Sequence, residues 1–497
     1  MTTKGALSIK GTVISDERQL ERYASDLSHY YIRPRLVAIP LDEHDVVGAV
    51  EFAVGNGIAI TPRGAGSNLS GSAVGDGMVI LMREMDRFIG KEGNVYACQP
   101  GMVFNQLDKQ ARVDGSFIPY DPSSRAFCTI GGNVGTRASG IRSLKYGSTD
   151  SCLDSIRFVS PVFGVVDTAQ DLPPELRLAL EDVAARLWED EEMLLLLETR
   201  ASLKSSSGYN LGAFLEERTV NRMAAHLMVG SVGTLAVFTE VRLKLRPLYK
   251  ERLLYLAFFD SLPEAVRMML PAREFSPSGF ELLDSFGVKN LAALVPAPSE
   301  AKAVIMIEFD EALGEAESKM KALLKDMGSN SMLFRDQAFI DKIWEVRESN
   351  LLRIKHELER PELKFLSFVD DLAVPPDRLP DLIEKMNTIF QEEKVQVIMY
   401  GHVGEGNLHI RPYIHLEGWE EVTKRLADKC FRAVLEYGGT ITGEHGMGRN
   451  RSKYLCEEWG KTACEYFHEI KQIFDPRGVM NPGVVFTDSD LTEHLRF

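Results

Sequence analysis

The stretch that decides the fold is Pro62-Arg63-Gly64-Ala65-Gly66-Ser67-Asn68-Leu69-Ser70-Gly71. It follows a short apolar segment, residues 58–61, and precedes a second one, residues 78–81. Upstream, a helical pattern of valines closes at Gly55-Asn56-Gly57, which is typical of a glycine C-cap. This order of helix, strand, glycine loop and strand predicts a mixed α and β domain. Its loop presents backbone N–H groups, and concave arrays of such groups bind phosphate.

The loop does not match either of the common nucleotide-binding motifs. It is neither Gly-x-Gly-x-x-Gly at a strand-to-helix turn nor Gly-x-x-x-x-Gly-Lys-Ser/Thr. A nicotinamide Rossmann site and a P-loop hydrolase are therefore disfavoured. Taken alone, the loop could also be interpreted as a surface turn.

Two more clusters of glycine and hydroxyl residues strengthen the case for a nucleotide. Residues 121–124 lead into residues 129–140, and residues 230–237 pass into an alternating segment, 238–245, that predicts a strand. Two such loops can embrace a dinucleotide from both sides. The alternative is three loops of one sheet, which composition does not reject.

Two runs near the C-terminus, residues 401–409 and 443–448, gather three of the ten histidines beside a carboxylate. In a straight helix, positions seven apart are separated by about 10 Å, whereas two imidazoles must each reach one metal at about 2.0–2.2 Å. His402 and His409 can converge only if glycines between them fold the chain back. Glu444 is a candidate third ligand, which leaves His445 as a proton acceptor. Ordinary buried histidines in glycine turns are the alternative, and the pairing of the two runs disfavours it.

Composition sets the broad class. At 497 residues the chain is expected to form two domains. A net charge of -15 argues against nucleic acid as a partner. The start of the sequence lacks the apolar core of a signal peptide and no apolar run approaches 18 residues, so a cytoplasmic protein is expected. Six cysteines without any Cys-x-x-Cys predict reduced thiols and no iron–sulfur cluster.

The middle of the chain predicts a second unit. After Arg246-Pro247, strand-like segments (252–259, 304–309 and 395–400) alternate with helical ones (263–270, 311–327 and 379–394). Such alternation indicates an α+β unit on an antiparallel or mixed sheet. Residues 172–217, which lie before this boundary, are expected to be mostly helical.

Together these residues resemble the FAD-dependent D-2-hydroxy-acid dehydrogenases, the D-lactate dehydrogenase and glycolate oxidase flavin-subunit group of the vanillyl-alcohol oxidase and p-cresol methylhydroxylase superfamily. The resemblance covers residues 33–485, with ordered matches at 63–71, 122–140, 204–210, 230–237 and 474–483. It implies an α+β, two-domain fold of the p-cresol methylhydroxylase type. The FAD domain is expected at 1–246 and the substrate-binding cap at 247–440, with 441–497 returning to the FAD domain.

The resemblance also implies the site. Candidate metal ligands are His402, His409 and Glu444, for Zn, Mn or Fe; His445 is the base, and Arg347 grips the substrate carboxylate. The alternative for Arg347 is a helix-surface arginine paired with Glu345 or Glu348. Expected FAD-binding residues are Pro62, Arg63, Gly64, Ala65, Gly66, Ser67, Asn68, Ser70, Gly71, Pro122, Ser123, Thr129, Gly131, Gly132, Asn133, Gly135, Thr136, Ser139, Gly140, Gly233, Val237 and Asn481.

The activity implied by the resemblance is oxidation of a small D-2-hydroxy acid, D-lactate or glycolate, to the 2-keto acid, with hydride transfer to the N5 atom of a non-covalent FAD. Electrons then pass to a separate acceptor: an iron–sulfur subunit, an electron-transferring flavoprotein, a cytochrome or a quinone. A homodimer is left open.

Three alternatives remain at this point: a D-2-hydroxyglutarate-type dehydrogenase, a non-oxidative relative of alkyl-dihydroxyacetonephosphate synthase, and a flavin-carrying scaffold subunit. Glu405 stands where the family that the chain resembles usually has Asp. This difference bears on the identity of the substrate more than on the chemistry.

Overall fold

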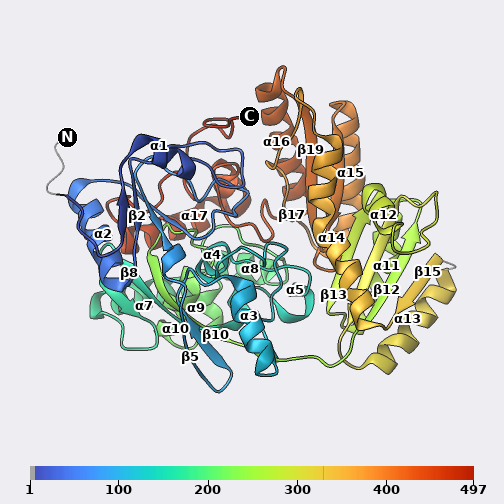
Figure 1. The fold of residues 1–497 in the computed structure, drawn as a ribbon, viewed down its shortest axis with the longest axis horizontal. Coiled ribbons are helices and arrows are strands. Elements are labelled where there is room, and N and C mark those ends of the chain that lie inside the picture. The colour runs from blue at the N-terminus through green and yellow to red at the C-terminus, as the bar shows by residue number, and fades with distance from the viewer. Residues whose placement is uncertain (1–5, 328–329) are drawn as a thin grey trace.

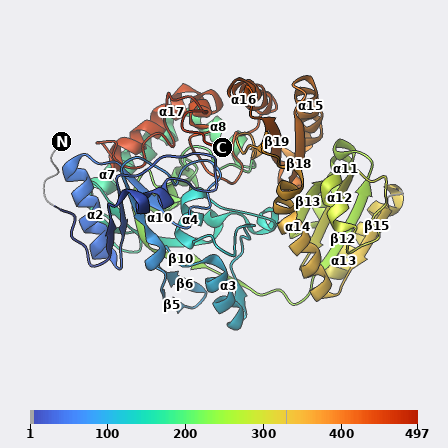
Figure 2. The ribbon, with the colours of Figure 1, turned by 45° about the horizontal axis from the view of Figure 1, so that its top comes forward.

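The computed structural model describes residues 6–327 and 330–497, so the first five residues of the N-terminal stretch considered above lie outside the description. The described chain forms two lobes (Figure 1). One lobe combines the N-terminal half with the C-terminal helix α17 (Leu455–Phe474), and the other is formed by the central segment. Figure 2 shows the same division after a 45° turn. The mixed helix and sheet architecture that the sequence predicts is confirmed.

The glycine loop 64–71 leaves the edge of a small sheet in the first lobe. The strand order of this sheet is β1 (Thr12–Ile14), β2 (Leu36–Ile39), β4 (Met78–Leu81) and β3 (Ile60–Arg63). Strands β2 and β3 both pair with β4 in parallel, so the carboxyl ends of these strands meet where the loop begins. Helix α2 (Glu43–Asn56) ends at Gly57, whose φ of 61° confirms the predicted cap.

The second sheet of this lobe is antiparallel and carries the other predicted loops. Its order is β5 (Phe88–Glu92), β6 (Val95–Cys98), β10 (Val237–Lys244), β8 (Leu153–Ser160) and β9 (Gly164–Asp167). The predicted strand at 238–245 is thus β10, displaced by one residue. The predicted helical region is confirmed as α7 (Pro174–Glu189), α8 (Glu191–Arg200) and α9 (Ala213–Glu216). A two-stranded ribbon, β7 (Ser116–Phe117) with β11 (Arg246–Pro247), lies at the expected boundary.

The second lobe is built on an eight-stranded antiparallel sheet, one of the two options that the alternation left open. Its order is β15 (Asn330–Phe334), β12 (Leu253–Phe259), β14 (Ala303–Phe309), β13 (Gly279–Asp284), β18 (Gln396–Gly401), β19 (Asn407–His415) and β16 (Leu363–Phe365), with β17 (Leu372–Ala373) also paired to β19. Helix α12 (Ser285–Leu291) packs on α14 (Gln337–Leu358). Helices α11 (Leu262–Met269), α15 (Leu379–Glu392) and α16 (Trp419–Glu436) form a second packed group, and α13 (Leu313–Met327) precedes β15.

The C-terminal segment returns to the first lobe. Met480 pairs with Ile60 of β3, and the side-chain amide of Asn481 donates to the carbonyl oxygens of Ser72 (2.8 Å) and Val232 (2.7 Å). One side chain therefore ties together two of the three loops that the sequence singles out. The division into residues 1–246, 247–440 and 441–497 stays a prediction.

The expectation that all cysteines are reduced is wrong. Cys456 and Cys464 form a disulfide with their Cα atoms 5.7 Å apart. Eight residues of straight helix would separate them by about 12 Å, but Gly460 breaks α17 with a φ of 77° and folds the chain back. The other four cysteines are free and buried. Among the described residues, no helix combines the length and apolarity needed to cross a bilayer.

Buried charge pairs join the lobes. Arg142 of the first lobe donates to Glu308 of the second at 2.9 Å, and both side chains are almost fully buried. Lys145 pairs with Asp310 at 2.5 Å, and Arg125, which is 32% exposed, pairs with Glu348 at 2.9 Å. Removing one partner of a buried pair is costly, so these contacts hold the second lobe in register over the first.

Candidate active site

A cavity of about 350 Å³ opens between the two lobes. The three predicted loops of the first lobe line one part of it, and residues of β18, β19 and α14 line the other. The predicted cofactor residues that line this cavity are Pro62, Arg63, Gly64, Ala65, Gly66, Ser67, Asn68, Pro122, Ser123, Thr129, Gly131, Gly132, Asn133, Gly135, Thr136, Ser139, Gly233 and Val237. All four residues predicted as metal ligands or base, and Arg347, line it as well.

Four predicted cofactor residues do not line the cavity: Ser70, Gly71, Gly140 and Asn481. They contact other segments of the chain instead. A Cβ on Gly140 would lie 1.9 Å from the carbonyl oxygen of Asp121, and one on Gly71 would meet the Tyr30 ring at 2.4 Å. These glycines are needed for close chain packing, which a sequence motif does not distinguish from cofactor contact.

The loop fits a diphosphate. Within the described residues, the backbone N–H groups of positions 65–69 have no protein acceptor. The shape of the loop is held by Arg63, whose guanidinium donates to the carbonyl oxygens of Ser25 (2.8 Å), Ala73 (3.2 Å) and Tyr23 (3.3 Å). Free N–H groups on a rigid loop at a cavity are the chemistry that binds an anionic cofactor, so the residues present fit FAD.

A tight hairpin brings the first histidine run together. Strands β18 and β19 pair antiparallel with Tyr400 opposite His409, and the chain turns between them at residues 402–406. Gly406 has a φ of 72°, and a Cβ there would lie 1.9 Å from the carbonyl oxygen of Val374. The predicted folding back of the chain between His402 and His409 is therefore confirmed.

We expect Gly406→Ala to lower the free energy of unfolding by at least about 2 kcal/mol, because the left-handed backbone and the clash add. Gly418→Ala is the matched control: it has a φ of 70° but nothing within 4 Å of an added Cβ. It should cost about 1 kcal/mol. Urea unfolding of both variants measures the difference. Equal losses would show that the close approach to Val374 contributes nothing.

Three predicted ligands meet at one carboxylate oxygen. Glu444 Oε1 lies 3.1 Å from His402 Nε2 and 3.3 Å from His409 Nε2. Tetrahedral ligands at about 2.0–2.2 Å from an ion are roughly 3.3–3.6 Å from one another. Each imidazole nitrogen is close to this distance from the carboxylate oxygen, and a mixed N and O donor set suits Zn, Mn or Fe. The residues present therefore fit a divalent ion.

Both histidine rings are held by their outer nitrogens. The Nδ1–H group of His402 donates to Glu281 Oε1, and that of His409 donates to the backbone carbonyl oxygen of Asp370 at 3.0 Å. Such partners fix the tautomer in which Nε2 keeps its lone pair for a metal. Burial lowers the pKa of His402, but Glu281 and Glu444 outweigh burial and raise it to about 9, so an ion that binds Nε2 displaces a proton there.

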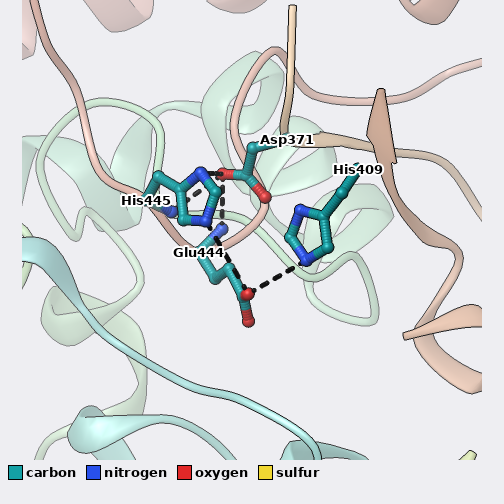
Figure 3. Close-up of side chains that lie close together, drawn as sticks. All are labelled: Asp371, His409, Glu444 and His445. Atoms are coloured by element: carbon teal, nitrogen blue, oxygen red, sulfur yellow. Dashed lines mark hydrogen bonds and ion pairs between the residues drawn. The ribbon is translucent and has the colours of Figure 1, made fainter. Parts of the chain in front are cut away.

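A second set of side chains also has metal-ligand spacing. Asp371, His409, Glu444 and His445 offer atoms within 4.8 Å of one another, and Figure 3 shows the two imidazoles next to each other with the Glu444 carboxylate close to both. However, Asp371 Oδ2 already accepts from the N–H groups of Glu444 (2.9 Å) and His445 (2.8 Å) and from the hydroxyl of Thr442 (2.7 Å). An oxygen so occupied is a poor ligand, so we favour His402 over Asp371.

His445 has a half-buried imidazole, 19% exposed, that is not used as a structural donor. Its Nδ1 has no hydrogen-bond partner among the described residues, and the nearest carboxylate oxygen, Asp370 Oδ2, is 3.5 Å away. Its ring stacks on His409 with centroids 5.2 Å apart. Burial lowers the pKa of His445, but Asp371 and Asp370 outweigh burial and raise it above its ordinary value. An imidazolium formed there is stabilised by two carboxylates.

Arg347 is not a surface arginine. Its side chain is 5% exposed, and Nε (2.9 Å) and Nη2 (2.5 Å) both donate to Glu281 Oε2. Glu348, one of the partners considered from sequence, pairs with Arg125 instead. Nη1 of Arg347 has no protein partner among the described residues, and the residue lines the cavity. This nitrogen is free to bind a carboxylate.

Sequence reasoning missed Arg411 and Lys204. Arg411 lies two residues after His409 on β19, and alternation along the strand could have placed both on one face. It is 2% exposed and lines the cavity. Lys204 Nζ lies 2.9 Å from Glu444 Oε2 and 3.1 Å from Glu405 Oε2, which gives the unusual Glu405 a partner.

Two protein families match the chain. The FAD binding domain matches residues 34–167, and the family described as FAD linked oxidases, C-terminal domain, matches residues 248–485. The glycolate oxidase subunit GlcD of Bacillus subtilis is 27% identical, covering 92% of this chain and 90% of its own. The D-lactate dehydrogenase of Anaerostipes hadrus is 26% identical, covering 96% and 94%. The D-2-hydroxyglutarate dehydrogenase of Escherichia coli K12 is 28% identical over 93% of this chain, which spans 49% of that relative.

Solved structures share the fold. The 4-ethylphenol oxidase of Gulosibacter chungangensis superposes with a TM-score of 0.70 at 14% identity, covering 95% of this chain and 94% of its own. A p-cresol methylhydroxylase with bound substrate gives a TM-score of 0.67 at 13% identity, covering 96% and 95%. At these identities the likeness concerns the fold alone, and it confirms the predicted p-cresol methylhydroxylase-type architecture.

Proposed function

Because the chain belongs to the FAD-linked oxidases and is an FAD-dependent oxidoreductase, we propose that it oxidises a small D-2-hydroxy acid to the corresponding 2-keto acid. One observation carries the proposal. The cavity that the flavin-type loops line is also lined by His402, His409, Glu444, His445 and Arg347. D-lactate and glycolate are the first candidates, in keeping with the names of two relatives.

Each residue answers a different requirement of this reaction. Arg347 binds the substrate carboxylate, because a guanidinium offers planar, charge-assisted donors. His445 takes the hydroxyl proton as general base, and Asp370 and Asp371 stabilise the charge that it acquires. His402, His409 and Glu444 hold the divalent ion, which when bound polarises the hydroxyl as a Lewis acid.

A flavin held by the glycine loops that line the cavity would supply the acceptor for the α-hydrogen, which would leave as hydride. Each turnover would leave two electrons on the flavin. These electrons must be passed on before the next turnover, because only the oxidised flavin accepts a hydride. The four free cysteines are buried and scattered, so an acceptor outside this chain is required: an iron–sulfur subunit, an electron-transferring flavoprotein, a cytochrome or a quinone. Cys128 lines the cavity, but burial raises the pKa of its thiol, which disfavours a thiolate linkage to the flavin.

The test is anaerobic mixing of the FAD-loaded protein with D-lactate, glycolate, D-malate and D-2-hydroxyglutarate, and with the L-isomers of the chiral acids. We expect loss of the flavin absorbance near 450 nm with at least one D-acid or glycolate, and none with the L-isomers. Dithionite reduction supplies the control for a reducible flavin. A flavin that dithionite bleaches but no acid bleaches would contradict the proposal and favour a scaffold role.

A further inference from the structure

We propose that Glu281 is a positioning residue that joins the ion-binding side of the site to the substrate-binding side. By holding His402 and Arg347 with one carboxylate, it couples binding of the divalent ion to binding of the substrate carboxylate. The proposal rests on the proposed function for the roles of these two residues. No sequence motif led to Glu281, which lies 121 residues from His402.

Both oxygens of Glu281 are in use. It lies on β13, in the centre of the eight-stranded sheet, with a fully buried side chain. Oε1 accepts from the Nδ1–H group of His402, and Oε2 accepts from Nε and Nη2 of Arg347 at 2.9 and 2.5 Å. Because the two oxygens belong to one rigid group, a rotation that serves one partner withdraws the acceptor from the other.

For His402, this contact sets the direction of the lone pair. With Nδ1–H donated to Glu281, Nε2 is the nitrogen that faces Glu444 at 3.1 Å. A carboxylate partner on the outer nitrogen also makes the ring a more basic ligand. Losing this partner frees the ring to rotate and to change tautomer.

The same carboxylate also fixes the orientation of the Arg347 guanidinium. Two of its three nitrogens donate to Glu281, which leaves the third, Nη1, without a protein partner among the described residues in an arginine that lines the cavity. Without Glu281, the guanidinium of Arg347 loses the acceptor of its Nε and Nη2 groups and its buried counter-charge. Burial lowers the pKa of Arg347, and Glu281, together with Tyr400 and Glu444, more than restores it.

Stability alone does not explain a carboxylate at this position. A buried ion pair is often no more stabilising than apolar residues of the same volume. The neighbours of Glu281 on the strand, Phe280 and Leu282, are buried and apolar. A carboxylate in the middle of a sheet costs desolvation. We explain its presence by the orientation that it imposes on the His402 imidazole and the Arg347 guanidinium.

The test compares Glu281→Gln with Asp284→Asn in the FAD-loaded protein. Glutamine keeps the volume of the side chain, but its NH₂ group cannot accept from a donor. Asp284 is a matched control: it is also buried, lies on the same strand β13, and accepts from the backbone N–H groups of Phe286, Gly287 and Met399 without contacting His402 or Arg347. Binding of Mn²⁺ is measured by electron paramagnetic resonance, and binding of propionate by the change in the flavin spectrum.

Glu281→Gln is expected to weaken Mn²⁺ at least about tenfold and propionate about tenfold or more, with FAD content unchanged. Asp284→Asn should leave both affinities within about twofold. If Glu281→Gln keeps either affinity, the joining role is refuted. Neither titration requires turnover, so the result stands even if none of the acids reduces the flavin.

If Glu281→Gln fails to retain FAD, the Mn²⁺ affinity of Arg347→Met is measured instead. Removing a cation near a divalent ion site should raise Mn²⁺ affinity by electrostatics alone. If Arg347 instead helps to lock Glu281 against His402, the variant should lower Mn²⁺ affinity by about threefold or more. A rise would overturn the proposal.

Discussion

Replacing His445 with asparagine should slow flavin reduction by the best D-2-hydroxy acid at least about 100-fold, because a positioned general base contributes roughly that much or more. Asparagine fills part of the same space beside His409 but cannot take up a proton at neutral pH. The rate is measured by anaerobic stopped-flow absorbance, with the acid that bleaches the wild-type flavin fastest.

The variant should otherwise resemble the wild type. FAD content and propionate affinity are expected to change less than about twofold, because His445 is proposed to contact the hydroxyl and not the carboxylate. His415→Asn, at the exposed end of β19, is the matched control and should reduce at the normal rate. A near-normal rate in His445→Asn would remove this residue from the mechanism.

The sequence predicted those parts of the site that lie close together in the chain. The seven-residue spacing of His402 and His409 excluded a straight helix and required a reversal at glycine, and the β18–β19 hairpin has that reversal at Gly406. Local rules of backbone geometry were enough. The same holds for the cap of α2 at Gly57, where a glycine in the left-handed region ends the helix.

The partners of these residues were not predictable in the same way. Helical spacing offered Glu345 and Glu348 as partners for Arg347, whereas the structure pairs it with Glu281, 66 residues away. Periodicity identifies which face of an element is buried, but it does not say which strand covers that face. The sheet order brings β13 beside β18, and only this order places Glu281 within reach of both His402 and Arg347.

The disulfide illustrates the same limit. Cys456 and Cys464 have a spacing that belongs to no common cysteine motif. Their contact depends on Gly460, which interrupts an otherwise regular helix with a φ of 77°. A lone glycine in a helical pattern is usually tolerated without a break, so local rules do not predict that the chain folds back there.

Replacing His402 with alanine should weaken binding of a divalent ion at least about 100-fold, more than is usual for loss of an outer hydrogen-bond partner. His402 supplies one of the two imidazole nitrogens that lie within 3.3 Å of Glu444 Oε1. The remaining pair, His409 and Glu444, would leave an incomplete donor set for Zn, Mn or Fe. Metal content after equilibrium dialysis, and Mn²⁺ titration followed by electron paramagnetic resonance, measure the loss.

The same measurement decides between the two sets of ligands that the geometry allows. If His402, His409 and Glu444 hold the ion, His445→Asn keeps metal affinity within about threefold while losing flavin reduction, because the base is not a ligand. If Asp371, His409, Glu444 and His445 hold it, His445→Asn loses the ion and His402→Ala keeps it. The two substitutions therefore have opposite outcomes under the two assignments. The occupied lone pairs of Asp371 Oδ2 favour the first, in which the ion and the proton acceptor are neighbours held by separate side chains.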